Sequence, residues 1–208
     1  MIIHLILEGY LEEPVADKLL EISGHQKGTV YGRQGFGYIS TKAHAFEALT
    51  RSGCGVLVLT DFRDSGAECP PMAVKKYLLC HKPNPSPSFL LRFAEAELES
   101  WLLADREAMA CFLGVPLKKV PCEPDKESHP KRALVNIARK SRKARIKNGL
   151  IPPKNSCRAF GPAYLSLMTG FINDFWRPLE AAKSSSSLNS CIARLQGLEK
   201  KIDDGTTS

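Results

Sequence analysis

The stretch that decides the fold is the first twelve residues, Met1-Ile-Ile-His-Leu-Ile-Leu-Glu-Gly-Tyr-Leu-Glu12. Five of the six residues from 2 to 7 are apolar, which predicts a short buried β-strand. Glu8 follows this strand directly, and Gly9 permits a tight turn before a helix predicted over residues 13–23. In an open α/β sheet, ligands bind just beyond the carboxyl ends of the strands. The opening residues therefore predict an α/β sheet that presents a carboxylate where a site would form.

Four consecutive apolar residues with helical patterns before and after them predict a parallel strand buried on both faces at residues 53–61, and a third buried strand is predicted at residues 88–93. A weaker strand is predicted near residues 28–31. Helices are predicted over residues 42–52 (capped by Thr41), 72–81 and 94–113. The expected fold class is α/β, with a mainly parallel sheet flanked by helices and a C-terminal helical lobe.

Acidic residues follow each of the three strongest predicted strands: Glu8, then Asp61 with Asp64, then the cluster of residues 95–99. Several carboxylates in one pocket repel each other, and a bound cation relieves that repulsion. Oxygen ligands without an accompanying His or Cys set favour Mg²⁺ or Mn²⁺. The alternative for the third cluster is a structural one, because glutamates early in a helix interact favourably with its dipole.

The composition limits the class of protein. The chain has 208 residues and is 43% hydrophobic, which suits a core domain (1–114) with an appended basic, mainly helical lobe (115–208). No apolar run is long enough to span a membrane and no signal peptide is evident, so we expect a soluble, cytoplasmic protein without a membrane partner. The seven scattered cysteines favour reduced, mostly buried thiols over disulfides or a zinc site.

Positive charge is concentrated in the second half of the chain. The net charge is +7, yet residues 118–158 alone carry thirteen Lys or Arg against three acids. A basic amphipathic helix is predicted over residues 130–147. This pattern fits nucleic acid, a solvated surface or, least well, a membrane surface. The candidate phosphate contacts in the lobe are Lys131, Arg139, Arg142 and Arg158. Arg33, in a glycine-rich stretch, and Arg63 are the candidates in the core domain.

Two motifs of the first half resemble the TOPRIM fold. Residues 7–12, Leu-Glu-Gly-Tyr-Leu-Glu, are similar to the E-G-x-x-E opening of TOPRIM nucleases, including the overcoming-lysogenization-defect type. Residues 59–64, Leu-Thr-Asp-Phe-Arg-Asp, are similar to the second acidic element, although Arg63 stands where the usual Asp-x-Asp pattern has its second acid. The rest of the chain resembles small prokaryotic TOPRIM-like proteins, through residues 92–105, 130–134, 161–165, 175–176 and 187–188.

This resemblance implies a Mg²⁺- or Mn²⁺-dependent nuclease that acts on DNA or RNA. It implies that Glu8, Asp61 and Asp64 are catalytic and hold the metal, with Glu12, Glu97 and Glu99 as further ligands. Proteins of this group are associated with ABC- or SMC-type ATPases in phage-defence loci, which implies an ATPase partner in an antiviral complex. A homodimer or a hetero-oligomer would fit this role.

Two other functions remain open from the sequence. The first is a TOPRIM-like subunit with impaired catalysis, which binds nucleic acid or serves as an ATPase adaptor. It is motivated by Arg63 in the second acidic element. The second is a metal-dependent phosphotransferase or phosphatase that acts on a small molecule, against which the long basic segment argues.

Overall fold

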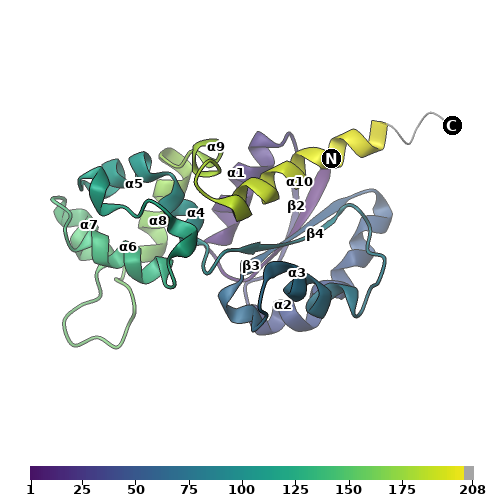
Figure 1. Cartoon of the computed structure of the whole chain (residues 1–208), viewed down its shortest axis with the longest axis horizontal. Coiled ribbons are helices and arrows are strands. Elements are labelled where there is room, and N and C mark those ends of the chain that lie inside the picture. The colour runs from purple at the N-terminus through teal and green to yellow at the C-terminus, as the bar shows by residue number, and fades with distance from the viewer. Residues whose placement is uncertain (204–208) are drawn as a thin grey trace. The chain divides into compact units, whose positions relative to one another are not determined.

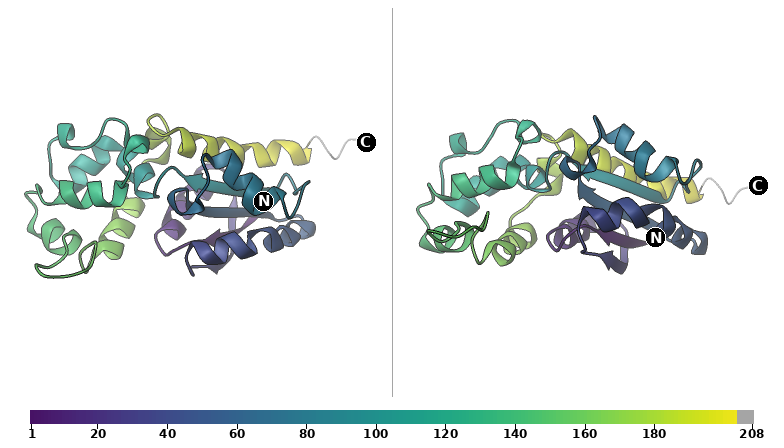
Figure 2. Two further views of the ribbon diagram at one scale, coloured as in Figure 1. Left: turned by 60° about the horizontal axis from the view of Figure 1, so that its bottom comes forward. Right: turned by 90° about the horizontal axis from the view of Figure 1, so that it is seen from below.

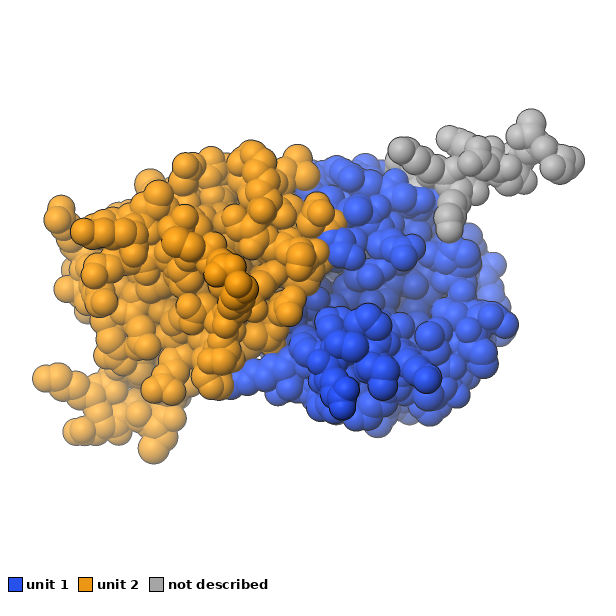
Figure 3. All heavy atoms as spheres, in the orientation of Figure 1, with its two compact units in different colours: residues 1–94, 190–208 blue, residues 95–189 orange. Residues whose placement is uncertain are grey.

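The computed structural model describes the backbone of residues 1–203 and the side chains of residues 1–198 (Figure 1). The chain forms two compact units, coloured separately in Figure 3. Unit 1 comprises residues 1–94 and 190–208, of which 204–208 lie outside the described residues. Unit 2 comprises residues 95–189.

Unit 1 is built on a four-stranded parallel sheet with the strand order β2-β1-β3-β4. The strands are β1 (Ile2–Leu7), β2 (Gln26–Gly32), β3 (Gly55–Asp61) and β4 (Phe89–Ala94). β1 and β3 pair in register with Leu7 opposite Leu59, which aligns their carboxyl ends. The predicted α/β class with a parallel sheet flanked by helices is confirmed.

Alternating strand residues bury the sheet on both faces. Side chains such as Ile6 and Val58 pack against one set of helices, which consists of α2 (Phe36–Lys42), the 3₁₀ segment η1 (Ala43–Ser52), α3 (Pro70–Val74) and the π-helical turn η3 (Lys75–Leu79). The other face lies toward α1 (Glu12–Ile22) and α10 (Ser186–Asp203) (Figures 1 and 2). The ring nitrogen Nε2 of His25 lies 2.8 Å from the carbonyl oxygen of Leu195, which joins the start of β2 to α10.

All of the regular secondary structure of unit 2 is helical. Its helices are α4 (Glu99–Ala104), α5 (Arg106–Leu113), α6 (Pro130–Ala138), α7 (Ala144–Leu150), α8 (Tyr164–Asp174) and α9 (Pro178–Ala181), with 3₁₀ turns at Leu117–Lys119 and Pro124–Lys126. Figure 2 shows these helices from two further directions.

Three predicted helices are interrupted. The expected helix over 42–52 is α2 followed by η1, and Thr41 donates its hydroxyl to Gly37 and Tyr38 within α2 instead of capping a helix. The expected helix over 94–113 begins only at Glu99, because Ala96 has a positive φ of 57°, and it is interrupted at Asp105 between α4 and α5. Glu95 and Glu97 therefore lie in a turn before α4 and do not share a helix face with Glu99. The third interruption, at Ser141, divides the expected basic helix into α6 and α7.

The units divide between residues 94 and 95, whereas the sequence placed the boundary between 114 and 115. The physical reason lies in the side chains of α4, which are buried within unit 2. The Trp101 indole donates to Ser187 Oγ (2.8 Å), and the Trp176 indole donates to the Trp101 carbonyl oxygen (3.2 Å). Asp105 accepts from the Arg177 guanidinium (2.6 Å).

The structure bears on two expectations from the composition, which concern the cysteines and a membrane-spanning segment. All seven cysteines are free thiols, but four are exposed and only Cys191 is buried, so the expectation of mostly buried thiols is wrong. Burial raises the pKa of the Cys191 thiol to about 12. Within the part of the chain that the structure describes, no helix combines the length and the apolar character needed to cross a membrane.

We predict that Gly32→Ala destabilises the protein severely. Gly32 has a φ of +94°, and an added Cβ would lie 2.3 Å from the backbone oxygen of Leu7. Chemical denaturation should show a free energy of unfolding that is lower by at least about 2 kcal/mol. Gly37→Ala is the matched control, since nothing lies within 4 Å of its added Cβ. Equal stability of the two variants would contradict this account of the β1–β2 contact.

Candidate functional site

The candidate site lies at the carboxyl edge of the sheet in unit 1, between β1 and β3. From β1 the chain winds to β2 on one side and then crosses to β3 on the other side of β1. The carboxyl ends of β1 and β3 therefore form the topological switch point, where parallel α/β sheets bind their ligands. Glu8 follows the last residue of β1, and Asp61 is the last residue of β3.

The Glu8 carboxylate bridges these two strand ends. Its Oε2 accepts hydrogen bonds from the Thr60 hydroxyl and from the backbone N–H of Asp61, the latter at 3.2 Å. Thr60 is 1% exposed, so its hydroxyl is held in the interior. Within the described residues, both hydrogen bonds of the Glu8 carboxylate are to Oε2. The arrangement orients the carboxylate and leaves Oε1 available to a ligand.

The backbone around Glu8 is held by the loop that follows β2. The backbone N–H of Arg33 donates to the carbonyl oxygen of Leu7 (2.7 Å), and the backbone N–H of Gly35 donates to the carbonyl oxygen of Glu8 (3.0 Å). The glycine-rich stretch thus contacts the main chain of β1 closely. Gly32 serves this packing, because an added Cβ there would lie 2.3 Å from the backbone oxygen of Leu7.

Glu12 belongs to the same turn as Glu8 and begins α1. It is 7% exposed, and an added Cβ on Gly9 would lie 3.1 Å from Glu12 Oε2. The Glu12 carboxylate therefore lies over the β1–α1 turn, at the N-terminus of α1, where negative charge interacts favourably with the helix dipole.

The two acids at the end of β3 are more exposed than Glu12. Asp61 is half-buried, whereas Arg63 and Asp64 are exposed on a 3₁₀ turn (Arg63–Ser65). Among the described residues there is no group of three His, Cys, Asp or Glu side chains arranged to hold a metal ion. The structure brings Glu8 to the end of β3 but does not gather Glu8, Asp61 and Asp64 into one three-carboxylate cluster.

The carboxylates at the ends of β1 and β3 fit one magnesium ion. Mg²⁺ is commonly held by one or two carboxylates, with water and substrate phosphates completing its six ligands. Glu8 and Asp61 supply two such carboxylates at adjacent strand ends. The fit is therefore to a single ion that retains several waters, and a second ion has no comparable set of ligands among the described residues.

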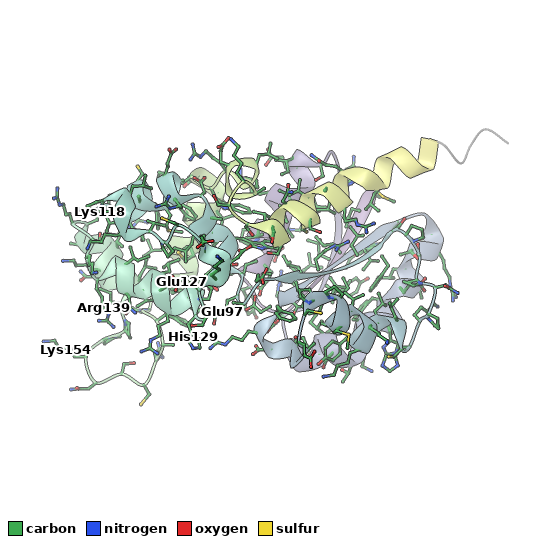
Figure 4. The ribbon with its side chains drawn as sticks, viewed as in Figure 1. Glu97, Lys118, Glu127, His129, Arg139 and Lys154 are labelled. Carbon is green, nitrogen blue, oxygen red and sulfur yellow. The ribbon has the colours of Figure 1, made fainter. Side chains whose placement is uncertain are left out.

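Glu97 and Glu99 have partners within unit 2. Glu97 Oε2 accepts the backbone N–H of Lys131 (2.9 Å) at the start of α6, and Glu97 is labelled in Figure 4. Glu99 is 1% exposed, and its Oε1 accepts from the Tyr164 hydroxyl (2.7 Å) and lies 3.3 Å from Lys131 Nζ. The Lys131 ammonium also lies 5.5 Å from the ring centre of Phe160. Three segments that carry the family resemblance thus meet around one buried carboxylate.

The predicted phosphate contacts differ in exposure. Arg33 forms an ion pair with Glu13 and lies 5.4 Å from the ring centre of Tyr10. The hydrogen bonds from Lys27 and Arg33 hold the pKa of the Glu13 carboxyl below its usual value, against the opposing effect of burial. The exposed members of the set are Arg63, Arg139, Arg142 and Arg158. Figure 4 shows Lys118, Arg139 and Lys154 spread widely over unit 2.

Thr60 is the one site residue that sequence reasoning missed. Its only signal is its position one residue before Asp61, at the end of an apolar strand. A threonine there fits a β-strand by propensity alone, so its role as a donor to Glu8 depends on the pairing of β1 with β3.

Comparisons with known proteins do not assign this chain to a family. No protein-family model matches the chain, and neither a curated protein nor a solved structure matches it.

We predict that Lys131 stabilises unit 2 through Glu99. Lys131→Met leaves the buried Glu99 carboxylate without its cation, so the free energy of unfolding should fall by about 2–3 kcal/mol. Adding Glu99→Gln should recover part of this loss, with a coupling energy of about 1–2 kcal/mol. The exposed Arg139→Met is the matched control and should change stability by no more than about 0.5 kcal/mol. Equal effects of Lys131→Met and Arg139→Met in denaturant titrations would refute the role of this pair.

Proposed function

We propose that this protein is a Mg²⁺- or Mn²⁺-dependent nuclease that hydrolyses phosphodiester bonds in DNA. One observation carries the proposal. The Glu8 carboxylate lies at the switch point of a parallel sheet, oriented by the Thr60 hydroxyl and the Asp61 N–H. An oriented carboxylate at this place, with a second acid at the next strand end, is suited to a divalent cation and a phosphorylated ligand.

In this proposal Glu8 and Asp61 hold the ion, and Thr60 keeps Glu8 in position. When bound, the ion would neutralise charge on a phosphoryl group and lower the pKa of a bound water. Glu12 and the exposed Asp64 remain secondary candidates, because each lies within four residues of one of these two acids. Glu97 and Glu99 are not included, since their described contacts are to residues of unit 2.

Unit 2 supplies positive charge for a polyanionic substrate. Residues 95–189 contain sixteen Lys or Arg against ten Asp or Glu. Exposed cations of this kind contribute affinity that does not depend on base sequence and that falls with added salt. Arg139, Arg142 and Arg158 are the exposed members of the predicted set in this unit.

The proposed partner and cellular role are supported by the sequence and not by the geometry of the site. An ABC- or SMC-type ATPase partner and a function in defence against phage rest on the family resemblance of the sequence, whereas the expected cytoplasmic location rests on its hydropathy. An RNA substrate is compatible with the same acids and cations.

A second candidate function is nucleic-acid binding without cleavage, as a clamp or an ATPase adaptor. Two observations favour it. The described residues contain no group of three metal-ligating side chains, and the exposed Arg63 occupies the position of an expected acid. Such a subunit would bind DNA equally well with and without Mg²⁺.

We predict that Glu8→Gln and Asp61→Asn each lower the rate of DNA cleavage by about 100-fold or more, because each removes a charged metal ligand. The assay follows the nicking and linearisation of plasmid DNA with Mg²⁺ or Mn²⁺, with and without the candidate ATPase. Glu21→Gln is the matched control. Glu21 is an exposed acid near the end of α1, which leads to the start of β2 and hence to the opposite edge of the sheet.

The outcomes separate the two functions. Cleavage that survives Glu8→Gln would overturn the assignment of Glu8 as a metal ligand. DNA binding without cleavage, under every combination of metal and partner, would favour the binding subunit. Loss of activity in Glu21→Gln to the same extent would show that the assay responds to net charge alone.

A further inference from the structure

The break between α6 and α7 is fixed to the end of α5. The Ser141 hydroxyl donates to the Leu113 oxygen, and Lys143 donates its N–H to Ser141 Oγ (2.9 Å). The Lys143 ammonium donates to the backbone oxygens of Cys111 (2.8 Å) and Phe112 (3.0 Å). A cation at this position satisfies the last carbonyl groups of a helix. Lys143 is therefore an ordered part of unit 2, and the segment around it has a defined backbone.

Two hollows of unit 2 share Lys143 as a lining residue. One has a volume of about 210 Å³ and is lined in part by Phe112, Ile146 and Leu167. The other has a volume of about 500 Å³ and is lined in part by Arg142. Because both are lined in part by Lys143, they form neighbouring sections of one surface of unit 2.

An exposed aromatic ring lines the smaller hollow. Phe175 is 43% exposed, and its ring centre lies 5.6 Å from that of Phe112. Gly170 also lines this hollow, and nothing lies within 4 Å of an added Cβ there, so space remains open beside it. The hollow thus offers an aromatic ring and room for a flat group.

Cations line both hollows. Arg145 and Lys143 line the smaller hollow together with Phe175, and Arg142 lines the larger one. Within the described residues, neither Arg142 nor Arg145 forms an ion pair, whereas Asp174 is the one acid in the wall of the smaller hollow. The charge of the surface therefore complements a ligand that carries several negative charges.

We propose that these two hollows bind single-stranded nucleic acid, with one base stacked on Phe175 and the flanking phosphates held by Arg142 and Arg145. The inference deepens the proposed function, on which it rests, by naming the strandedness of the ligand. Aromatic rings beside a basic groove are the usual means of binding single strands without regard to sequence. In a duplex the bases are paired and stacked, so none is available to Phe175.

The chemistry of the hollows favours a nucleotide chain over an acidic peptide. A peptide needs partners for its backbone N–H and C=O groups, and only Ser166 and Asp174 offer side-chain oxygens in the smaller hollow. A nucleotide needs an aromatic ring and cations, which Phe175, Arg142 and Arg145 provide.

The test measures binding of the full chain to a fluorescently labelled thymidine strand by anisotropy, with divalent ions chelated so that no cleavage occurs. The same strand paired with its complement serves as the duplex probe. Phe175→Leu removes the ring and keeps an apolar side chain, so it should weaken single-strand binding by roughly 5- to 100-fold. Phe175→Tyr should bind as the wild type does, and Leu179→Ala is the matched control for an exposed apolar residue outside the hollows.

The charged residues give an independent measurement. Arg145→Ala should lower the slope of log affinity against log salt by about one, because one phosphate contact is lost. Asp174→Asn should strengthen binding, because it removes the acid from the wall. Thermal unfolding of each variant shows whether a change in affinity reflects a change in fold.

Three results would overturn the proposal. The first is single-strand binding that Phe175→Leu leaves unchanged. The second is duplex binding that is as tight as single-strand binding and equally weakened by Phe175→Leu. The third is binding of an acidic aromatic peptide in the hollows without any binding of the single strand. Failure of the nuclease proposal is distinguishable, because it would appear in the cleavage assay, either as no cleavage under any combination of metal and partner or as cleavage that survives Glu8→Gln. Phe175-dependent binding measured without divalent ions would be unaffected.

Discussion

The parallel pairing of β1 with β3 determines where the candidate residues of unit 1 lie. This pairing places Leu7 opposite Leu59, so the next residues along each strand, Glu8 and Thr60, meet at the carboxyl edge. The hydrogen bonds to Glu8 Oε2 then cost little conformational entropy, because both strand ends are already fixed by the sheet. The loop after β2 adds backbone hydrogen bonds to Leu7 and Glu8 from the other side. The position of Glu8 is thus a consequence of the sheet itself.

The strands could be predicted from the sequence, while the breaks in the helices could not. Strands buried on both faces are mostly apolar: β3 contains four consecutive apolar residues, and β1 and β4 are interrupted only by His4 and by Arg92. The positive φ of Ala96 has no such signal, because alanine favours helices. The break at Ser141 depends on the Leu113 carbonyl oxygen, 28 residues earlier in the chain. Local patterns carry no information on a contact of that range.

The same distinction applies to the candidate site. Glu8 and Asp61 could be predicted as neighbours because parallel strands end at one edge of a sheet. Glu97 and Glu99 were grouped with them only because they follow a strand, and the partners that bury them, Tyr164 and Lys131, are distant in sequence. The role of Lys131 likewise changes from an open phosphate contact to an ion pair with a buried acid. The charge pattern of the sequence therefore did not predict which cations are exposed and which, like Lys131, pair with a buried acid.

The most direct test of the central claim is the location of a bound divalent ion. Mn²⁺ added to the isotopically labelled protein broadens the amide signals of nearby residues in NMR spectra. We predict broadening of residues 8–10, 33–35 and 61–64, and its loss in Glu8→Gln while Glu21→Gln retains it. Broadening confined to other acidic residues, or unchanged broadening in Glu8→Gln, would contradict a metal site at the ends of β1 and β3.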